Sequence, residues 1–107
     1  MGTLVGVDAR VRDVDERERY EISEDGELAG FVAYHRRPRL IAFVHTEIDP
    51  RFEGRGLGSV LVAGALDDAR ERGLAVLPFC PFVNAYIQHH PEYQDLVPEA
   101  FHREFSL

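Results

Sequence analysis

The chain has 107 residues, of which 45% are hydrophobic and 29% are charged. A chain of this length supports one hydrophobic core, so we expect a single domain over residues 1–107, with its core at about 19–97 and a tail at 98–107. The formal net charge is -7, which disfavours nucleic acid and anionic membranes as partners, because both attract positive proteins. No apolar stretch is long enough to span a membrane and no signal peptide is evident, which predicts a cytoplasmic protein.

The basic and thiol side chains exclude several kinds of chemistry. All 12 basic residues are arginines. Without lysine the chain has no Schiff-base residue and no Walker-type phosphate lysine. Cys80 is the only cysteine, which excludes an internal disulfide and a metal site built on paired cysteines. We expect no bound metal.

The first half of the chain has the alternation of strands. The charged run 13–19 predicts a solvated edge strand or arm, and a first strand follows from Arg19. Asp25-Gly26 is a strong hairpin signal, since a tight type I′ turn needs positive φ angles. A return strand is expected over 28–35. The next strand, 40–48, is apolar on both faces near its start and should be central in the sheet.

After residue 53 the apolar residues change from the alternation of strands to the spacing of a helix. Residues 54–72 have the apolar spacing of an amphipathic helix. The strand expected at 74–79 should therefore lie parallel to the strand at 40–48, through a right-handed crossover. A second helix is expected at 82–90. Phe101 and Phe105, at i and i+4, predict either a short amphipathic tail helix over an edge of the core or a dimer contact.

A glycine-rich segment, Gly54-Arg55-Gly56-Leu57-Gly58-Ser59, joins a strand to a helix. Such a turn can direct backbone N–H groups at an anion, and the helix N-terminus adds its own donors. A phosphate or pyrophosphate is the natural ligand, and a tight packing turn is the alternative. A Walker loop is excluded because there is no lysine, and a dinucleotide fingerprint because Gly58 comes one residue early.

The element order and this loop resemble the Gcn5-related N-acetyltransferase family. In that family a hydrophobic-x-Pro segment precedes a [QR]-x-x-G-x-[GA] loop, and here Ile48-Asp49-Pro50 precedes Glu53–Gly58. Glu53 stands where the family has Gln or Arg. The strings His45-Thr46-Glu47 and Pro78–Val83 resemble a compact branch of about a hundred residues. The resemblance implies a compact α+β fold with a mainly antiparallel sheet, one splayed parallel strand pair and two main helices.

The resemblance also implies a site for acetyl-CoA. The residues that it assigns to the cofactor are Ile48, Glu53, Gly54, Arg55, Gly56, Leu57, Gly58, Ser59 and Asn84. For Asn84, a helix N-cap is a compatible structural role.

Three residues are candidates for the chemistry. Strand alternation would place Ile41, Phe43, His45 and Glu47 on one face, just before the loop. In the family a glutamate on this strand acts as general base, and Glu47 lies at a comparable place. His45 could do the same task, because a histidine side chain is a common general base. Cys80 follows the next strand, where it is either a nucleophile with His45 as its base or a buried small hydrophobe.

The function that follows is an acetyl-CoA-dependent N-acetyltransferase acting on an unidentified amine, either directly or through an acetyl-Cys80. The acidic surface favours a cationic small molecule or a basic protein segment as acceptor. A non-catalytic acyl-CoA-binding or sensing module is one alternative, and a Cys-dependent thioesterase using Cys80 and His45 is another. We expect a monomer or a weak homodimer.

Overall fold

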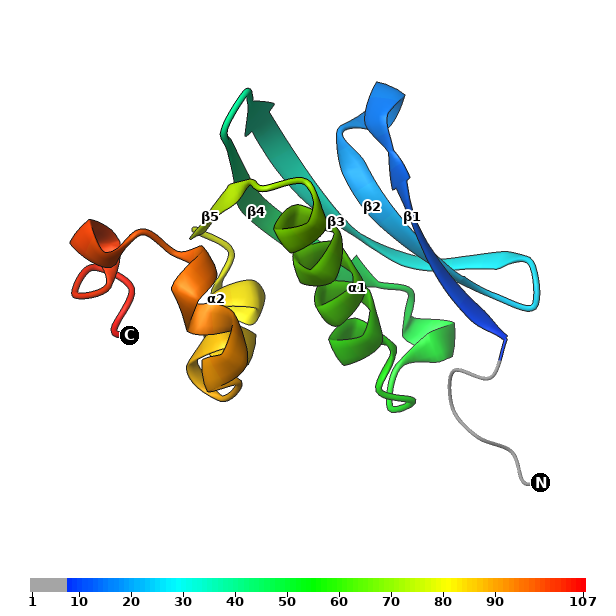
Figure 1. The fold of residues 1–107 in the computed structure, drawn as a ribbon. Helices are drawn as coiled ribbons and strands as arrows, with labels where there is room; N and C mark the ends of the chain where they lie inside the picture. Colours follow the sequence, from blue (N-terminus) through cyan, green and yellow to red (C-terminus); the bar gives the residue numbers. More distant parts are fainter. Residues whose placement is uncertain (1–7) are drawn as a thin grey trace.

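Five strands form one sheet in the computed structural model, which describes residues 8–107 (Figure 1). Their order across the sheet is their order along the chain. The strands are β1 (Ala9–Val14), β2 (Arg19–Glu24), β3 (Glu27–Arg37), β4 (Leu40–Ile48) and β5 (Ala75–Pro78). The first four pair antiparallel, and β5 pairs parallel to β4. The predicted α+β fold with one parallel pair is confirmed.

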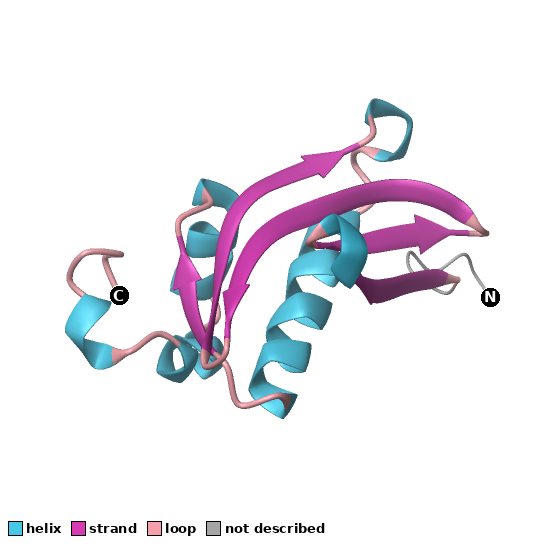
Figure 2. Cartoon of the chain, turned by 90° about the horizontal axis from the view of Figure 1, so that it is seen from above, coloured by secondary structure: helices cyan, strands magenta, loops and turns pink. Residues whose placement is uncertain are grey.

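Two α-helices complete the fold. Helix α1 (Leu57–Glu71) connects β4 to β5, and α2 (Pro81–Gln88) follows β5. The long strands β3 and β4 are strongly curved (Figure 2). The buried residues of α1 recur with helical spacing, as predicted, and the helix begins three residues later than the sequence indicated. The predicted hairpin is also present, since both Asp25 and Gly26 have positive φ.

Both helices pack on one face of the sheet. Val32 and Phe43 of the sheet, Leu66 of α1 and Val83 of α2 belong to one core cluster of buried side chains. That cluster extends beyond the expected limits of the core, because Phe105 from the tail joins it. The opposite face of the sheet carries neither α1 nor α2.

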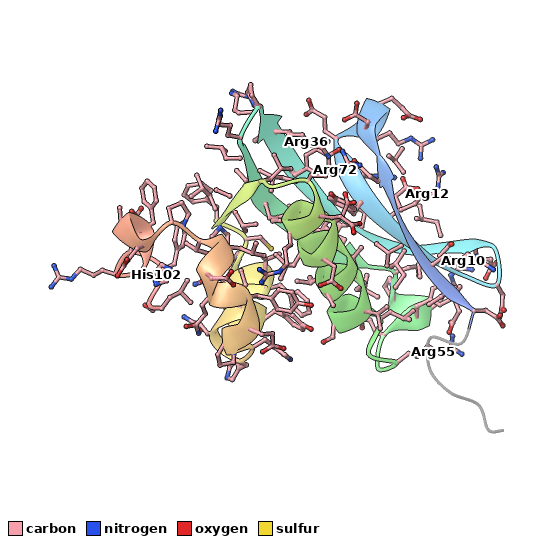
Figure 3. All side chains as sticks on the ribbon, viewed as in Figure 1. Arg10, Arg12, Arg36, Arg55, Arg72 and His102 are labelled. Atoms are coloured by element: carbon pink, nitrogen blue, oxygen red, sulfur yellow. The ribbon has the colours of Figure 1, made fainter. Side chains whose placement is uncertain are left out.

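The charged run 13–19, which begins within β1, is only partly solvated, which corrects the sequence prediction. β1 is an edge strand, as expected. However, the Asp13 side chain is only 11% exposed and pairs with Arg36 and Arg72 at 2.7 and 3.3 Å. Asp13 also accepts a hydrogen bond from the Tyr34 hydroxyl. Arg36 and Arg72 lie next to each other beside the last turn of α1 (Figure 3).

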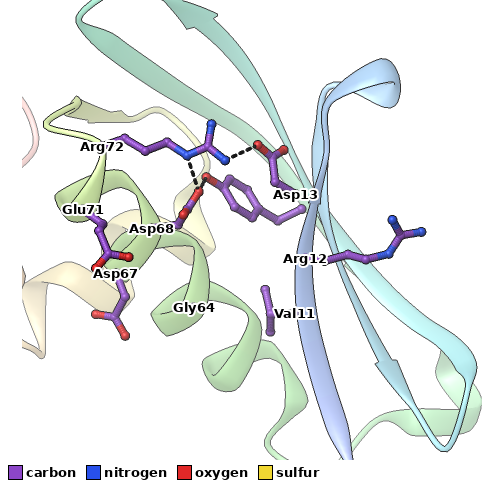
Figure 4. Close-up of a pocket in the computed structure, with 9 residues that line it drawn as sticks. Val11, Arg12, Asp13, Gly64, Asp67, Asp68, Glu71 and Arg72 are labelled. Atoms are coloured by element: carbon purple, nitrogen blue, oxygen red, sulfur yellow. Dashed lines mark hydrogen bonds and ion pairs between the residues drawn. The ribbon is translucent and has the colours of Figure 1, made fainter.

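The same polar network ties the sheet to α1 (Figure 4). The Tyr20 hydroxyl donates to Asp68 of α1, and Arg72 bridges Asp68 and Asp13. A groove of about 570 Å³ runs between β1 and α1 beside this network. At the middle of α1, Gly64 lets β1 approach closely, because a Cβ there would lie 3.0 Å from Val11.

The tail does not form the expected helix. Residues 98–107 instead form one short 3₁₀ turn, η4 (Glu99–Phe101), followed by further turns, and another 3₁₀ segment, η3 (Pro91–Leu96), precedes them. Phe105 is buried whereas Phe101 is exposed, so only one of the two spaced aromatics reaches the core.

The four tyrosines make stability sensitive to alkaline pH. Burial raises the pKa of Tyr20 and Tyr34, helped by their carboxylate partners, and burial raises that of Tyr86. Burial and a hydrogen bond to Asp67 raise the pKa of Tyr93 to about 12. Because the chain has no lysine, tyrosines are the main side chains that titrate between about pH 10 and 12.

We predict that the free energy of unfolding falls as the pH rises above about 10. In that range the unfolded chain releases tyrosine protons that the folded chain keeps, so rising pH favours unfolding. Guanidinium unfolding at about pH 9 and about pH 11 measures the difference. The variant Tyr20→Phe should show a shallower decline. Equal stability at both pH values would contradict the argument.

Candidate cofactor groove and acceptor face

A β-bulge in the middle of β4 organises the site. Tyr34 of β3 pairs with Phe43, whereas its neighbour Ala33 pairs with His45. Val44 therefore has no partner on β3 and is the extra residue of the bulge. A bulge of this kind shifts the alternation of side chains along its strand by one residue.

Because of this shift, the side chains in the second half of β4 lie on the faces opposite to those predicted from the sequence. Ile41 and Phe43 are buried on the α1 side, as expected. After the bulge, Thr46 pairs with Val32, whose side chain is buried on that same side. His45 and Glu47 instead point to the opposite face. The prediction that both share a face with Ile41 and Phe43 is therefore wrong.

Strands β4 and β5 separate at the bulge. They pair only from Leu40 with Ala75 to Phe43 with Pro78. The last backbone hydrogen bond between the two segments is donated by the Cys80 N–H to the Phe43 carbonyl, at 2.8 Å. The predicted splayed parallel pair is thus present, and Cys80 lies at the point where the strands separate.

The glycine-rich segment forms the start of α1. Gly54 and Gly56 both have positive φ, and a Cβ on either would meet nothing within 4 Å. Gly58 has a different role, because a Cβ there would lie 2.8 Å from the Phe82 ring of α2. Gly54 and Gly56 thus allow the turn, while Gly58 allows the close approach of the two helices.

Six consecutive backbone N–H groups, those of residues 54–59, donate no hydrogen bond to any group within residues 8–107. The first helical bond of α1 comes from the Val60 N–H to the Gly56 carbonyl. Unpaired N–H groups at a helix N-terminus form a positive site for an anion. We call these six groups the N–H cradle.

The cradle borders a groove of about 420 Å³, which we call the cofactor groove. Its wall comes from the end of β4, the loop, the first turn of α1 and the start of α2. The lining residues are Thr46, Ile48, Phe52, Glu53, Gly54, Gly56, Leu57, Gly58, Ser59 and Phe82. Most of the residues assigned to the cofactor are brought together here. Thr46, Phe52 and Phe82 were missed, Thr46 because only the bulge turns it to this side.

Two of the assigned residues lie differently from the prediction. Arg55 was assigned to the cofactor, but it does not line the groove and its guanidinium pairs with Glu24 of β2. Asn84 does not cap α2, since no side chain caps that helix and Cys80 holds the N-cap position. Instead the Asn84 Oδ1 atom is buried and has no hydrogen-bond partner within residues 8–107.

Cys80 is buried, with 3% of its surface exposed. Its Sγ lies 3.1 Å from Thr46 Oγ1, and either atom can be the donor. His45 cannot serve as its base in this arrangement, because His45 points to the other face of β4. The structure thus brings Cys80 to the splay but separates it from the two other residues predicted to be catalytic.

His45 and Glu47 lie together on the open face of the sheet. His45 Nε2 is 3.0 Å from Glu47 Oε2, and the two side chains are 57% and 63% exposed. The Phe31 ring lies 6.1 Å from the His45 ring, and the Arg19 guanidinium lies 4.3 Å from the centre of the Phe31 ring. We call these four side chains the open-face cluster.

Arg19 of the open-face cluster is held in place by an ion pair. Its Nε lies 2.8 Å from Glu21 Oε2, and Arg17 reaches the same oxygen at 3.0 Å. Burial opposes ionisation of Glu21, but the two arginines outweigh it and lower the pKa of that carboxyl. Glu21 therefore stays charged and fixes Arg19 over Phe31.

Solved structures with a similar fold are acetyltransferases. A GCN5-like putative N-acetyltransferase from Staphylococcus aureus matches with a TM-score of 0.64 and 19% identity, over 86% of this chain and 90% of that one. Ribosomal-protein-alanine N-acetyltransferase from Brucella melitensis matches with a TM-score of 0.53 and 21% identity, over 69% and 59% of the two chains. At these identities the likeness concerns the fold.

Sequence comparison points the same way. Residues 19–96 match the family model of the GCN5-related N-acetyl-transferases. The chain belongs to this family. Streptothricin acetyltransferase from Streptomyces lavendulae is 39% identical over 67 residues, which make up 61% of this chain and 35% of that relative. The match therefore spans about a third of the length of this curated acetyltransferase.

Features of this N-acetyltransferase-family chain fit acetyl-CoA. The N–H cradle matches the needs of a pyrophosphate, and Asn84 Oδ1, although it does not line the groove, is a buried acceptor without a partner within residues 8–107. Within residues 8–107 we find no cluster of three or more His, Cys, Asp or Glu side chains suited to a metal ion. None of the helices in that range is both long and apolar enough to cross a membrane.

We predict that Asn84→Ala leaves the thermal unfolding midpoint of the free protein unchanged or raises it. The substitution removes a buried acceptor that has no protein partner, so the folded state loses no hydrogen bond. The stabilisation by coenzyme A should instead decrease. Differential scanning fluorimetry with and without coenzyme A measures both effects. An unchanged coenzyme A shift would exclude a contact between Asn84 and the cofactor.

Proposed function

We propose that this protein binds acetyl-CoA in the cofactor groove and transfers the acetyl group to an amine. The observation that carries the proposal is the N–H cradle at the start of α1, in a chain of the N-acetyltransferase family. Acetyl-CoA, when bound, supplies an activated thioester. The residues proposed to hold it are the loop 53–59, Ile48 and Asn84.

Backbone groups bind the phosphates in this proposal. A protein with a net charge of -7 does not attract a polyanion through its overall field. The N–H groups of residues 54–59 concentrate positive potential at one point, independent of that net charge. The Glu53 side chain, where the family has Gln or Arg, contributes no positive charge.

The acceptor amine is proposed to meet the open-face cluster. An amine must lose a proton to become a nucleophile, and His45 and Glu47 are side chains that can accept one. They lie on β4 one residue either side of Thr46, which lines the cofactor groove. The cofactor and the acceptor would thus approach β4 from its two opposite faces. The acceptor class remains a cationic small molecule or a basic protein segment.

One observation favours a second candidate, a non-catalytic acyl-CoA-binding module. Within residues 8–107 no α-helix covers the open-face cluster, so the described part of the chain forms no enclosed acceptor pocket there. In that case acetyl-CoA would bind, but His45 and Glu47 would have no effect on any transfer rate. A Cys-dependent thioesterase is less favoured, because Cys80 is buried and separated from His45.

We predict that Ser59→Asp weakens coenzyme A binding without destabilising the protein. Ser59 is exposed in the first turn of α1, where a carboxylate interacts favourably with the helix dipole, by about 0.3–1 kcal/mol. The same carboxylate repels phosphates in the N–H cradle, and we expect a loss of affinity of at least about tenfold.

The matched control for this test is Ser59→Asn, which has the same shape without the charge. Isothermal titration calorimetry gives the affinity, and thermal denaturation confirms the fold of both variants. The Asn variant should bind coenzyme A nearly as well as the wild type. Equal binding by the Asp variant would contradict phosphate binding at the cradle.

We predict that Glu47→Gln lowers the rate of acetyl transfer without weakening coenzyme A binding. A general base contributes about 10²–10⁴-fold to such a reaction, and the amide cannot accept the proton. His45→Ala should change the pH profile, because it removes the neighbour at 3.0 Å. The assay follows release of free coenzyme A thiol with a panel of amines. Wild-type rates in both variants would support the non-catalytic module.

A further inference from the structure

A hollow of about 240 Å³ lies between the first residues of β3 and the end of β4. It is separate from the cofactor groove, although Ile48 lines both. Leu28, Phe31, Glu47 and Asp49 are among its lining residues. Of the eight residues that line it in the described part of the chain, two are acidic, none is basic and six are nonpolar. We call it the β3–β4 hollow.

A bulge in β3 leaves room for this hollow. Leu28 and Gly30 pair with consecutive residues of β2, so Ala29 between them is an extra residue of β3. The partners of Leu28 and Phe31 on β2 are two residues apart, so these two side chains share the open face of the sheet. On that face β3 places no side chain between them, because Gly30 has none and Ala29 is buried in the core.

The hollow has apolar side chains at both of its ends along β3. Phe31 forms a fixed wall, since the Arg19 guanidinium lies 4.3 Å from the centre of its ring and Glu21 holds Arg19. Leu28 is 44% exposed and has apolar surface left to bury. An apolar group between Leu28 and Phe31 would remove this surface from water, which favours binding.

A carboxylate lies next to the apolar part of the hollow. Glu47 is the cross-strand partner of Phe31, and its side chain is 63% exposed. The ion-pair partner of Glu47, His45, is charged only when protonated. Asp49 stays ionised, because Arg51 lowers the pKa of its carboxyl, but Arg51 also balances that charge. The hollow thus offers the Glu47 carboxylate beside apolar surface, which matches an ammonium group on an apolar tail.

We propose that the β3–β4 hollow binds the acceptor, and that the acceptor is a small primary amine with an apolar tail. Its ammonium group pairs with Glu47, and its tail lies between Leu28 and Phe31. This proposal rests on the proposed function, in which Glu47 is a candidate base for the amine. It narrows the acceptor class to small molecules and makes Leu28 and Phe31 the residues that determine specificity.

The volume and the lining of the hollow set limits on the tail. A water molecule occupies about 30 Å³ in the liquid, so the hollow has room for about eight groups of that size. A polar end on the tail would lose its water without gaining a partner among the nonpolar lining residues. A lysine side chain of a protein is a poorer match for the same reason, because its stem leads to the polar peptide backbone.

Three compounds with the same number of non-hydrogen atoms separate the two contacts. Pentylamine has the ammonium group and the apolar tail. Aminobutanol has a hydroxyl in place of the terminal methyl group, and pentanol has a hydroxyl in place of the amine. Each is titrated into the ¹⁵N-labelled protein without any cofactor. Pentylamine should produce saturable changes in the amide signals of residues 28–31 and 47–49, and the other two should bind at least about tenfold more weakly.

Two variants of Leu28 test the apolar wall, since this side chain is exposed enough to be replaced without loss of core packing. Leu28→Asn keeps the branched shape and removes the apolar character, whereas Leu28→Met keeps the apolar character. Thermal denaturation checks that both variants fold. In the acetyl-transfer assay, kcat/KM for pentylamine should fall by about tenfold in Leu28→Asn and by less than about twofold in Leu28→Met. The value for aminobutanol should change little in either variant.

The outcomes separate this proposal from the proposed function. Acetyl transfer with equal kcat/KM for pentylamine and aminobutanol, or with a clear preference for a lysine-containing peptide, would overturn the acceptor class and leave acetyl transfer intact. A protein that binds coenzyme A but acetylates no amine would contradict the transfer in the proposed function. The titration without cofactor would then still decide the role of the hollow. Pentylamine shifts centred on residues 28–31 and 47–49 would support an amine site there, and shifts elsewhere or none would overturn it.

Discussion

The extra residue in β4 is the constraint on which the site depends. Because Val44 has no partner on β3, the strand changes face at that point. The same region marks the end of pairing with β5, so the two strands separate where the side chains reverse. Thr46 then faces the cofactor groove, and His45 and Glu47 face the open side of the sheet. A regular strand would have placed all three on the wrong sides for this arrangement.

Binding by backbone groups explains how an acidic chain without lysine can accommodate a phosphate ligand. The arginine nearest the N–H cradle, Arg55, is occupied by Glu24, and other arginines hold the sheet to α1 through Asp13. These charged side chains thus stabilise the fold. The ligand site relies on the N–H groups of residues 54–59, whose direction is fixed by Gly54 and Gly56. Such a site is less sensitive to net charge than a cluster of basic side chains.

Features that local sequence patterns determine could be predicted, whereas features that arise from contacts between residues far apart in the chain could not. The strand at 40–48, the hairpin at Asp25-Gly26, the crossover helix and the glycine-rich turn all depend on neighbouring residues. The bulge at Val44 does not, because a shift in register leaves the local pattern of apolar residues plausible on either face. The pairing of Arg55 with Glu24 and the burial of Asp13 join residues far apart in the chain. The tail was misjudged because two aromatics at i and i+4 do not by themselves require a helix with one buried face: Phe105 is buried and Phe101 is exposed.

The most direct test of the account is an amide NMR titration of the ¹⁵N-labelled protein with coenzyme A. The account predicts that the backbone N–H signals of residues 54–59 change most, because these groups would gain the phosphate as their acceptor. The signals of β1, which lies at the far edge of the sheet, should stay in place. Saturable changes centred elsewhere, with the signals of residues 54–59 unmoved, would contradict the assignment of the cofactor to this loop.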